Sequence, residues 1–302
     1  MGTDMPSQPI NILALGEVLW DVFPDGPRFG GAPANFACAC AELEWERVRV
    51  RLASAVGNDQ LGIDAKARLR ERSVDVSLMA IRPEPTGQVM VELDDQGRAS
   101  YRFIEDPAWE HLELGDALLS VAKQADVTYF GTLGQRAELS RKTIRELLNA
   151  GSPSCLKVFD INLRPPHWTD DVLLSSFAFA NVVKLNDEEL PQVGKMLGLP
   201  VNERAAMEQL RTKFNLKLVA LTRGSTGSLM LDSTGTFHEL PAKPVKIVDT
   251  VGAGDAFTAA LALGLAFGYP LEQLHQSAVN AAAFVCTQAG GTPVFPAGMR
   301  VN

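Results

Sequence analysis

Apolar and polar residues follow two different spacings along this chain, one typical of β-strands and one typical of α-helices. Short apolar runs, such as residues 10–15 and 127–130, are typical of strands that are buried in a sheet. Elsewhere apolar residues recur every three or four positions, as Leu61, Ala65 and Leu69 do, which places them on one face of a helix. We therefore expect the chain to mix strands and helices.

The order of these elements predicts the class of fold. Strands are predicted at 10–15, 17–23, 51–56, 86–93, 98–104, 127–130, 156–160, 182–185, 218–221, 228–231 and 236–239. Helices are predicted at 36–43, 61–69, 116–123, 139–149, 187–197, 203–214, 257–267 and 271–286. Because strands and helices alternate after residue 115, we expect an α/β fold with a mostly parallel central sheet and helices on both faces.

One region departs from this alternation. Two successive strands, 86–93 and 98–104, are joined by a turn at 94–97 and form a hairpin between two α/β units. The strand at 17–23 alternates polar and apolar residues, as a half-exposed strand does, so it can join the hairpin. The sequence predicts a single domain over residues 1–302, with a small inserted β-sheet lid built from about 17–25 and 77–105.

Charge and composition exclude several classes of partner. The chain of 302 residues has a net charge of −8, whereas nucleic acids and membrane surfaces attract basic patches. No apolar run reaches the ~20 residues of a membrane span, and the polar first nine residues do not resemble a signal peptide. The four cysteines have neither metal-binding nor disulfide-framework spacing. We expect a cytoplasmic protein that binds neither nucleic acid nor membrane.

The most informative segment is the glycine-rich turn that precedes the helix predicted at 257–267. Gly252, Ala253 and Gly254 allow a ligand to approach the backbone, and the first amides of a helix have no partners within the helix. Such a helix end attracts an anion. Asp255 would repel a resting phosphate, unless it accepts a proton while the phosphoryl group is transferred. The alternative is an ordinary glycine turn with a capping aspartate.

Two common nucleotide-binding motifs do not fit this segment. A dinucleotide site needs G-x-G-x-x-G early in the chain, and the position of the third glycine is Phe257 here. A P-loop needs Gly-Lys followed by Ser or Thr, which the chain does not contain. An anion site with an acidic residue instead suits phosphoryl transfer to a hydroxyl, which depends on positioning, charge stabilisation and a base.

Several motifs together resemble one family. The run Asp-Thr-Val-Gly-Ala-Gly-Asp at 249–255 resembles the C-terminal signature of the PfkB (ribokinase-like) carbohydrate kinases. The run Gly-Gly-Ala-Pro-Ala-Asn at 30–35, followed by Val-Gly-Asn-Asp-Gln-Leu-Gly at 56–62, resembles the N-terminal signature. The resemblance extends from about residue 13 to 291. It implies a ribokinase-like fold and an ATP-dependent sugar kinase.

The resemblance assigns roles to matching positions. It implies that Asp255 is the base that deprotonates the sugar hydroxyl, while the amides of Gly252, Ala253 and Gly254 stabilise the transferred phosphoryl group. It also implies a set of sugar contacts. These contacts are Asp21, Gly31, Asn35, Phe103, Asn162 and Arg164. Without the resemblance, Asn35 can be interpreted as a helix cap and Asp21 as an exposed strand residue. Arg164 can likewise be interpreted as one half of an ion pair.

Further matching positions concern ATP and metal ions. Asn186 and Glu189 match an N-x-x-E motif that organises Mg²⁺ through water in the family, although an acidic first helical turn is the simpler reading. The resemblance places the nucleotide beside Thr222, Gly224, Gly227 and Asn280. It also implies a possible K⁺ site. The backbone carbonyls expected there belong to Asp249, Val251 and Gly291.

The sugar is indicated by a second motif. The run 160–168, Asp-Ile-Asn-Leu-Arg-Pro-Pro-His-Trp, resembles a D-x-N-x-R-x-x-x-W segment of fructokinases and 2-keto-3-deoxygluconate kinases. In the second group the lid strand carries a Tyr-Tyr-Arg pattern that binds a carboxylate, which residues 100–103 match only in part. A fructokinase is the favoured reading, with 2-keto-3-deoxygluconate kinase or another PfkB sugar kinase as the alternative.

Two other functional classes and one assembly are compatible with parts of the sequence. A non-catalytic sugar or nucleotide sensor on the same fold is the competing class, and the missing third glycine disfavours a nicotinamide dehydrogenase. Apolar residues on the lid strands suggest a homodimer formed through exposed Val89, Val91 and Tyr101.

Overall fold

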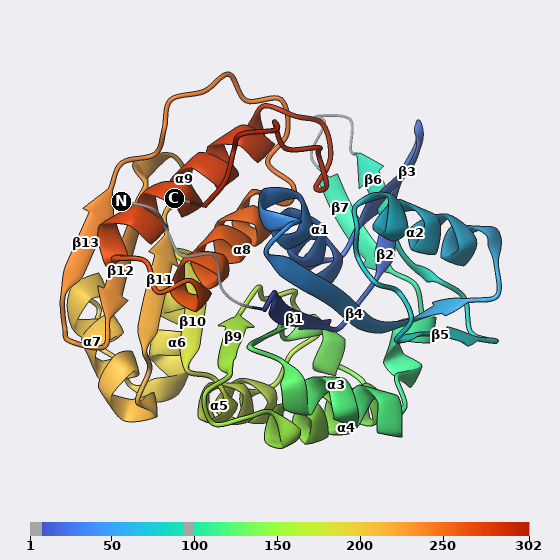
Figure 1. The fold of residues 1–302 in the computed structure, drawn as a ribbon, viewed down its shortest axis with the longest axis horizontal. Helices are drawn as coiled ribbons and strands as arrows, with labels where there is room; N and C mark the ends of the chain where they lie inside the picture. The colour runs from blue at the N-terminus through green and yellow to red at the C-terminus, as the bar shows by residue number, and fades with distance from the viewer. Residues whose placement is uncertain (1–7, 94–98, 302) are drawn as a thin grey trace.

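The structure, a computed structural model, describes residues 8–93 and 99–301 (Figure 1). Nine strands form the central sheet, in the order β13-β12-β11-β10-β9-β8-β1-β4-β5. Their bounds are Phe237–Leu240, Ser228–Asp232, Leu218–Thr222, Val182–Asn186, Leu156–Asp160, Val127–Phe130, Ile10–Leu15, Val48–Gly57 and Met79–Arg82. The pairs from β11 to β5 are parallel, and β12 and β13 are antiparallel additions. The predicted mostly parallel sheet is confirmed.

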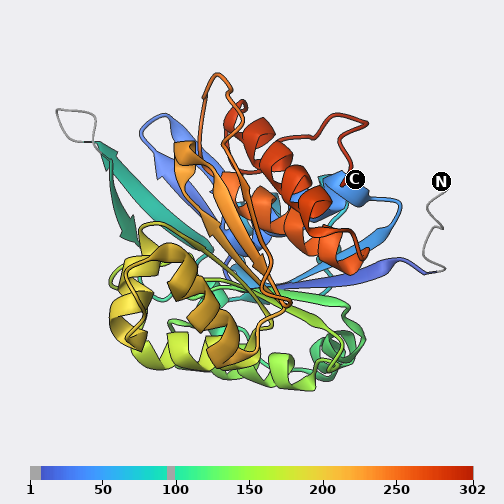
Figure 2. The same cartoon turned by 90° about the vertical axis from the view of Figure 1, so that its left-hand side faces the viewer.

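Helices cover both faces of this sheet (Figures 1 and 2). One face carries α1 (Ala32–Glu44), α8 (Ala253–Ala266) and α9 (Leu271–Cys286). The opposite face carries α3 (Asp116–Gln124), α4 (Glu138–Ala150), α5 (Asp170–Phe179), α6 (Glu189–Leu197) and α7 (Glu203–Phe214). A further helix, α2 (Gln60–Glu71), follows β4. The architecture is the helix–sheet–helix arrangement that the sequence predicts.

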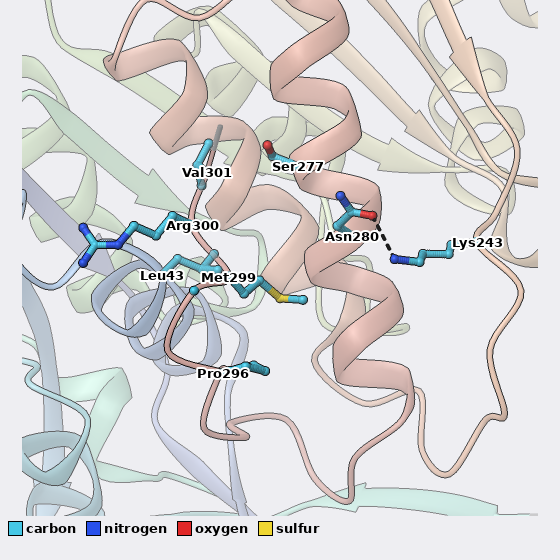
Figure 3. A pocket seen from close by; sticks show the side chains of 9 residues that line it. Leu43, Lys243, Ser277, Asn280, Pro296, Met299, Arg300 and Val301 are labelled. Atoms are coloured by element: carbon cyan, nitrogen blue, oxygen red, sulfur yellow. Dashed lines mark hydrogen bonds between the residues drawn. The ribbon is translucent and has the colours of Figure 1, made fainter. Parts of the chain in front are cut away.

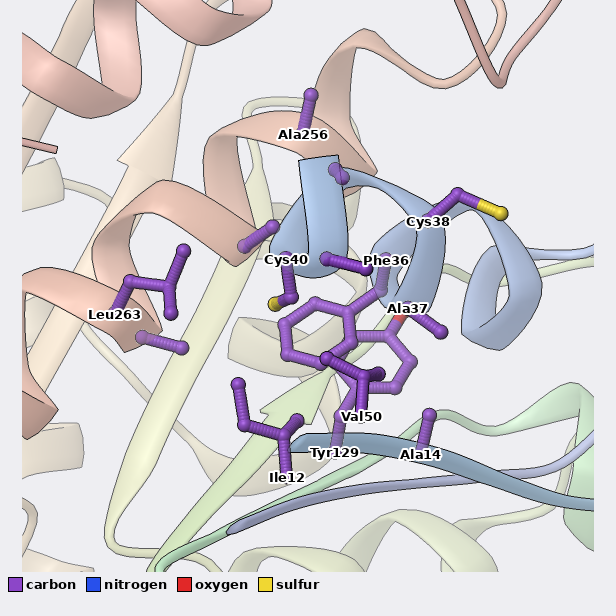
Figure 4. Close-up of a cluster of buried hydrophobic side chains, with 14 of the residues drawn as sticks. Ile12, Ala14, Phe36, Ala37, Cys38, Cys40, Val50, Tyr129, Ala256 and Leu263 are labelled. Carbon is purple, nitrogen blue, oxygen red and sulfur yellow. The ribbon is translucent and has the colours of Figure 1, made fainter. Parts of the chain in front are cut away.

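Each face of the sheet has its own apolar core because successive side chains of a strand point to opposite sides. In β1, Ile12 belongs to the core under α1 and α8, whereas Leu13 belongs to the core under α3 to α7. Under α1, the ring of Phe36 stacks on that of Tyr129, with centroids 4.2 Å apart (Figure 4). This packing fixes the start of α1 against the sheet.

A second, four-stranded sheet forms the lid. Its order is β3 (Gly26–Gly30), β2 (Leu19–Phe23), β6 (Gly87–Leu93) and β7 (Ala99–Phe103). It projects from one end of the central sheet, as Figure 2 shows. Its base packs through Leu19 and Val89 against Trp109 and Leu133. The inserted lid is therefore present, and the turn predicted at 94–97 lies outside the described residues.

Several details differ from the predicted elements, most clearly three elements and one helix start. The sequence analysis did not predict α5, β3 or β5, and α8 begins at Ala253 rather than at 257. The helix starts earlier because Gly252, with φ of 79°, ends the preceding turn and leaves the next residues free to enter the helix. Thr169 caps α5 by accepting a hydrogen bond from the amide of Val172.

The prediction of a lid dimer through exposed apolar residues is wrong in part. Val89 and Val91 are each 3% exposed, because they already pack inside this chain. The side chain of Tyr101 lies outside the described part. Separately, none of the helices in the described residues is both long and apolar enough to span a membrane.

Candidate active site

The starts of α1 and α8 bring two predicted residues together. Asn35, in the first turn of α1, donates a hydrogen bond from Nδ2 to Oδ2 of Asp255, in the first turn of α8, over 2.8 Å. Both side chains are buried, and they lie 220 residues apart in sequence. Asn35 therefore holds the orientation of the predicted base and is more than a helix cap.

The turn before Asp255 has backbone amides without acceptors among the described residues. No side chain caps α8 at Gly252, and within the described chain no group accepts from the amides of Gly252 and Gly254. The Ala253 amide donates to the carbonyl of Thr250 over 3.3 Å. Two of the three predicted amides are thus free to bind a ligand at the positive end of the helix.

Burial sets the electrostatics of Asp255. The pKa of this carboxyl is raised to about 6, mainly by burial and also by the nearby carboxylate of Asp160, while Asn35, Lys184 and Arg164 act in the opposite direction. A pKa near 6 suits a general base, because the group is ionised at neutral pH and still accepts a proton readily.

Glu17 is a site residue that the sequence analysis missed. Its pKa is raised to about 7, mainly by burial and also by the charge of Asp255. The backbone amides of Glu17 itself and of Ala32, at the start of α1, lower this pKa, and Oε2 has no partner in the described chain. The signal available was an acidic residue directly after the buried strand at 10–15.

The lid contributes Asp21 to the same region. Burial raises its pKa to about 6; Arg164 lowers the pKa and Asp249 raises it. Arg164 also lowers the pKa of Glu17 and Asp255, so its guanidinium acts on acids of both the lid and the main domain. The guanidinium donates a hydrogen bond to the carbonyl of Leu163 (3.0 Å), which leaves the rest of the exposed group for a ligand.

The remaining predicted sugar contacts surround this region. The ring of Phe103, on β7, meets that of His167 edge to face, with centroids 4.9 Å apart, so the lid touches the segment after β9. Asn162 lies in that segment, with φ of 41°. Gly31 lies against the backbone before β2, where an added Cβ would come within 2.7 Å of the Glu17 carbonyl oxygen.

The N-x-x-E motif forms a reciprocal helix cap. Asn186 Oδ1 accepts from the amides of Glu188 and Glu189 (2.9 and 2.8 Å). In return, Glu189 Oε2 accepts from the amide of Asn186 (2.8 Å), and its Oε1 accepts from that of Leu163 (2.9 Å). Glu189 thereby ties the segment after β9 to α6. Its oxygens fit a metal ion only through their remaining lone pairs, which suits contact through water.

The nucleotide-side residues lie on β11, on the turn that follows it and on α9. Thr222 ends β11, and Gly224 and Gly227 form the turn into β12. Asn280, on α9, accepts a hydrogen bond from Lys243 (3.3 Å) and lines a cavity of about 380 Å³ (Figure 3). Among the described residues, the lining of this cavity comes from α1, α9, Lys243 and the segment at 296–301 and includes none of the turn.

The three residues of the expected K⁺ site lie in segments that touch one another. Asp249 accepts hydrogen bonds from the amides of Val251 and Gly290, each over 3.0 Å. Gly252 packs directly on Gly291, since an added Cβ on Gly252 would lie 2.6 Å from its α-carbon. The carboxylate of Asp249 thus holds these two turns together.

A buried ion pair beneath α8 was also missed. Lys184, on β10, lies beside Asp160, on β9, with Nζ and Oδ1 3.2 Å apart. The hydroxyl of Thr258, on α8, donates toward Asp160 Oδ2 over 2.9 Å. A lysine inside the apolar run 182–185 was the sequence signal, because an unpaired lysine is rarely buried.

Comparisons with known proteins give a consistent result. The profile of the pfkB family of carbohydrate kinases matches residues 25–297. The fructokinase of Salmonella typhimurium is 31% identical, with 94% of this chain and 96% of that protein covered. An uncharacterized sugar kinase from Pyrococcus horikoshii, solved in complex with ATP, is 26% identical, with a TM-score of 0.78 and 94% of each chain covered.

A third similar protein was solved with a sugar. The fructokinase of Vibrio cholerae, in a form with bound fructose, ADP and calcium ion, is 27% identical; the TM-score is 0.76, and 95% of this chain and 96% of that chain are covered. The family match spans most of this chain, and the fold, the free amides and the held carboxylate agree with it. The chain belongs to the pfkB family of carbohydrate kinases.

Proposed function

We propose that this protein is a fructokinase that transfers the γ-phosphoryl group of ATP to a hydroxyl of fructose. The observation that carries the proposal is the buried Asp255, held by Asn35 at the open N-terminus of α8. Further support comes from the similar fructokinase of Vibrio cholerae, which was solved with bound fructose and ADP. The D-x-N-x-R-x-x-x-W run at 160–168 agrees with the same class of sugar.

The reaction uses two parts of this site, the carboxylate of Asp255 and the open amides of the turn before it. Because Oδ2 of Asp255 is bound by Asn35, Oδ1 faces the sugar and removes the proton of the hydroxyl as its oxygen attacks the γ-phosphorus. The bond from phosphorus to the β–γ bridging oxygen breaks, and ADP leaves with the electron pair. The amides of Gly252 and Gly254 stabilise the negative charge on the transferred group.

Sugar binding rests on buried polar atoms that lack partners. In the described chain these include Asn35 Oδ1 and Glu17 Oε2, both in residues that interact electrostatically or directly with Asp255. Unsatisfied buried acceptors favour a ligand that brings hydroxyl donors. Asp21 on the lid and Arg164 on the main domain complete the proposed sugar site from opposite sides.

Metal ions would have supporting roles. Asn186 and Glu189 would hold Mg²⁺ through water, and Mg²⁺ supplies neutralisation of the phosphate charge. The carbonyls of Asp249, Val251 and Gly291 would hold K⁺ near the start of α8. Replacing K⁺ by Na⁺, and titrating Mg²⁺ at fixed ATP, tests the two roles separately. Activity independent of K⁺ would remove the second.

A homodimer through the lid remains a proposal, supported now by the edge strands β3 and β7 rather than by Val89 and Val91. Small-angle scattering at two protein concentrations tests it, and a particle of monomer mass at both would reject it.

A substrate panel tests the proposed function. ADP release is measured with fructose, ribose, adenosine and 2-keto-3-deoxygluconate at matched concentrations, with an enzyme-coupled readout. The proposal predicts the highest kcat/KM for fructose. A higher value for 2-keto-3-deoxygluconate would establish the alternative substrate, and saturable binding of sugar without turnover of any would establish the sensor.

A further inference from the structure

The buried pair of Asp160 and Lys184 lies directly under the first turn of α8. The two residues are opposite each other in the parallel pairing of β9 and β10, so both side chains point to the same face. Asp160 is 0% exposed and Lys184 6% exposed, and their side chains meet at 3.2 Å. Removing both charges from water is costly before their attraction is counted. A buried pair at this place therefore calls for a functional explanation.

Two contacts connect the pair to the phosphoryl-binding turn. The hydroxyl of Thr258 lies 2.9 Å from Asp160 Oδ2 and 2.9 Å from the carbonyl of Gly254. Lys184 also approaches the turn directly, because an added Cβ on Gly254 would lie 3.2 Å from its Nζ. The ammonium thus lies beside the turn whose amides are left open, and it lies on the sheet side of that turn.

We propose that Lys184 is a positioning residue for phosphoryl transfer, one that fixes the first turn of α8 through Asp160 and Thr258 and keeps Asp255 ionised by its buried positive charge. The inference rests on the proposed kinase function and extends it to a residue that does not need to touch the substrate. The chemical consequence of this role is that Asp255 is ready to accept the proton at neutral pH.

The charges around Asp255 predict how two substitutions differ. The groups that interact with it come from five places: Glu17 after β1, Tyr129 on β8, Asp160 on β9, Arg164 after β9 and Lys184 on β10. Lys184 also faces Glu189 on α6. Lys184 lowers the pKa of Asp255 and Asp160 raises it. Removing one charge should therefore shift the titration of the base in the direction opposite to removing the other.

The test compares pH profiles of kcat/KM for fructose, or for the best sugar of the panel, from pH 5 to 9. In Lys184→Gln, which keeps a hydrogen-bonding group and lacks the charge, the acid limb should move up by about half a unit or more. At pH 7, kcat should fall by about tenfold, and the sugar KM should stay within about threefold. In Asp160→Asn the acid limb should move down. Lys195→Gln, on the exposed side of α6, is the matched control and should keep the profile of the unaltered protein.

The outcomes separate this inference from the function on which it rests. An acid limb that stays in place in both variants, or that moves the same way in both, would overturn the positioning role whatever happens to kcat. If Lys184→Gln does not fold, an Asp160→Asn limb that fails to move down overturns it alone. No sugar-dependent turnover by the unaltered protein would overturn the proposed function, and this inference with it.

Discussion

At the scale of single residues, the site is a group of carboxyl groups that are largely buried from water. Burial raises the pKa of Glu17 to about 7 and that of Asp255 to about 6, and each carboxyl raises the pKa of the other or of its neighbours. Such a site is costly for stability and useful for proton transfer. The cost to stability can be measured on Glu17, and the use in proton transfer can be measured on Asp255.

Glu17 shows the cost of this burial to folding stability. Its folded-state pKa is raised above the ordinary 4.5, so protonation favours the folded state, and the stability gained at low pH is lost as pH rises from about 4.5 through 7. Glu17→Gln removes the ionisation. Its melting temperature relative to the unaltered protein should therefore rise by a few degrees between pH 5 and pH 8. Thermal unfolding at the two pH values measures this difference.

Exposed Glu188 provides the matched control for this measurement. Glu188→Gln should give the same melting-temperature difference at both pH values. If Glu17→Gln also showed no change with pH, the buried ionisation of Glu17 would be refuted.

What the sequence could predict at this scale depended on the kind of signal. Asp255, Asn35 and Arg164 were found because they lie in recognisable motifs. Glu17 and Lys184 belong to no motif used in the prediction, and their burial follows from which strands pair, as for Lys184 opposite Asp160. Strand pairing between distant parts of the sequence cannot be predicted from local spacing, so the burial of these residues is known only from the structure.

At the scale of elements, the start of α8 is fixed by a glycine contact. Gly252 has φ of 79°, and an added Cβ would lie 2.6 Å from the α-carbon of Gly291. Gly268, at the other end of α8, has φ of 73° and open space around it. The two positions therefore share the backbone strain of an alanine, about 1–2 kcal/mol, and differ in the clash.

This pair gives a matched prediction. Gly268→Ala should lower the free energy of unfolding by the strain alone and leave kcat near its original value. Gly252→Ala should be less stable still and lose most of kcat, because the turn must move away from Gly291. Urea unfolding and steady-state kinetics check both. Equal stability and equal kcat in the two variants would contradict the proposed contact.

The reciprocal cap of α6 leads to a second prediction at this scale. Glu189→Ala leaves the amides of Leu163 and Asn186 without their acceptor, at about 1–3 kcal/mol for each that stays buried. Because the Leu163 contact holds the segment that carries Asn162 and Arg164, the sugar KM should rise several-fold. Glu188→Ala is the control. Lost stability with an unchanged sugar KM would show that this segment does not set sugar binding.

The elements themselves were predicted well where their spacing was regular. The helix at 271–286 and the strands at 127–130 and 156–160 have the predicted bounds. The helix α5 was missed because its apolar residues give little one-sided pattern, and β3 because its run of Gly, Pro and Arg is typical of a turn. β3 forms only because β2 offers it a partner.

At the scale of the whole molecule, the lid and the central domain enclose the site from two sides. The lid supplies Asp21 and contacts the main domain through Phe103 and His167. Closing such a lid excludes water, which favours transfer to the sugar over hydrolysis of ATP. The two-layered helical covering and the inserted lid were predictable from element order, while the position of the lid over the segment after β9 was not.

The lid contact can be tested through the partition of ATP. Phe103→Ala should raise the ratio of ATP hydrolysis to sugar phosphorylation several-fold, because the lid loses its ring contact with His167. Phe23→Ala, which removes a lid ring that lies under Arg28, should leave the ratio unchanged. Phosphate release and sugar phosphate are measured in the same reaction. An unchanged ratio in Phe103→Ala would exclude this contact as a water barrier.

The central claim is that Asp255 is the base of phosphoryl transfer, and Asp255→Asn tests it most directly. The amide keeps the size and can still accept from Asn35 Nδ2, so the fold and ATP affinity should be retained. The measurement is kcat with the best sugar, together with the dissociation constant of ATP. We predict that kcat falls by about 10²–10⁴-fold and that ATP binding stays within a few-fold. A variant with near-normal kcat would contradict the account.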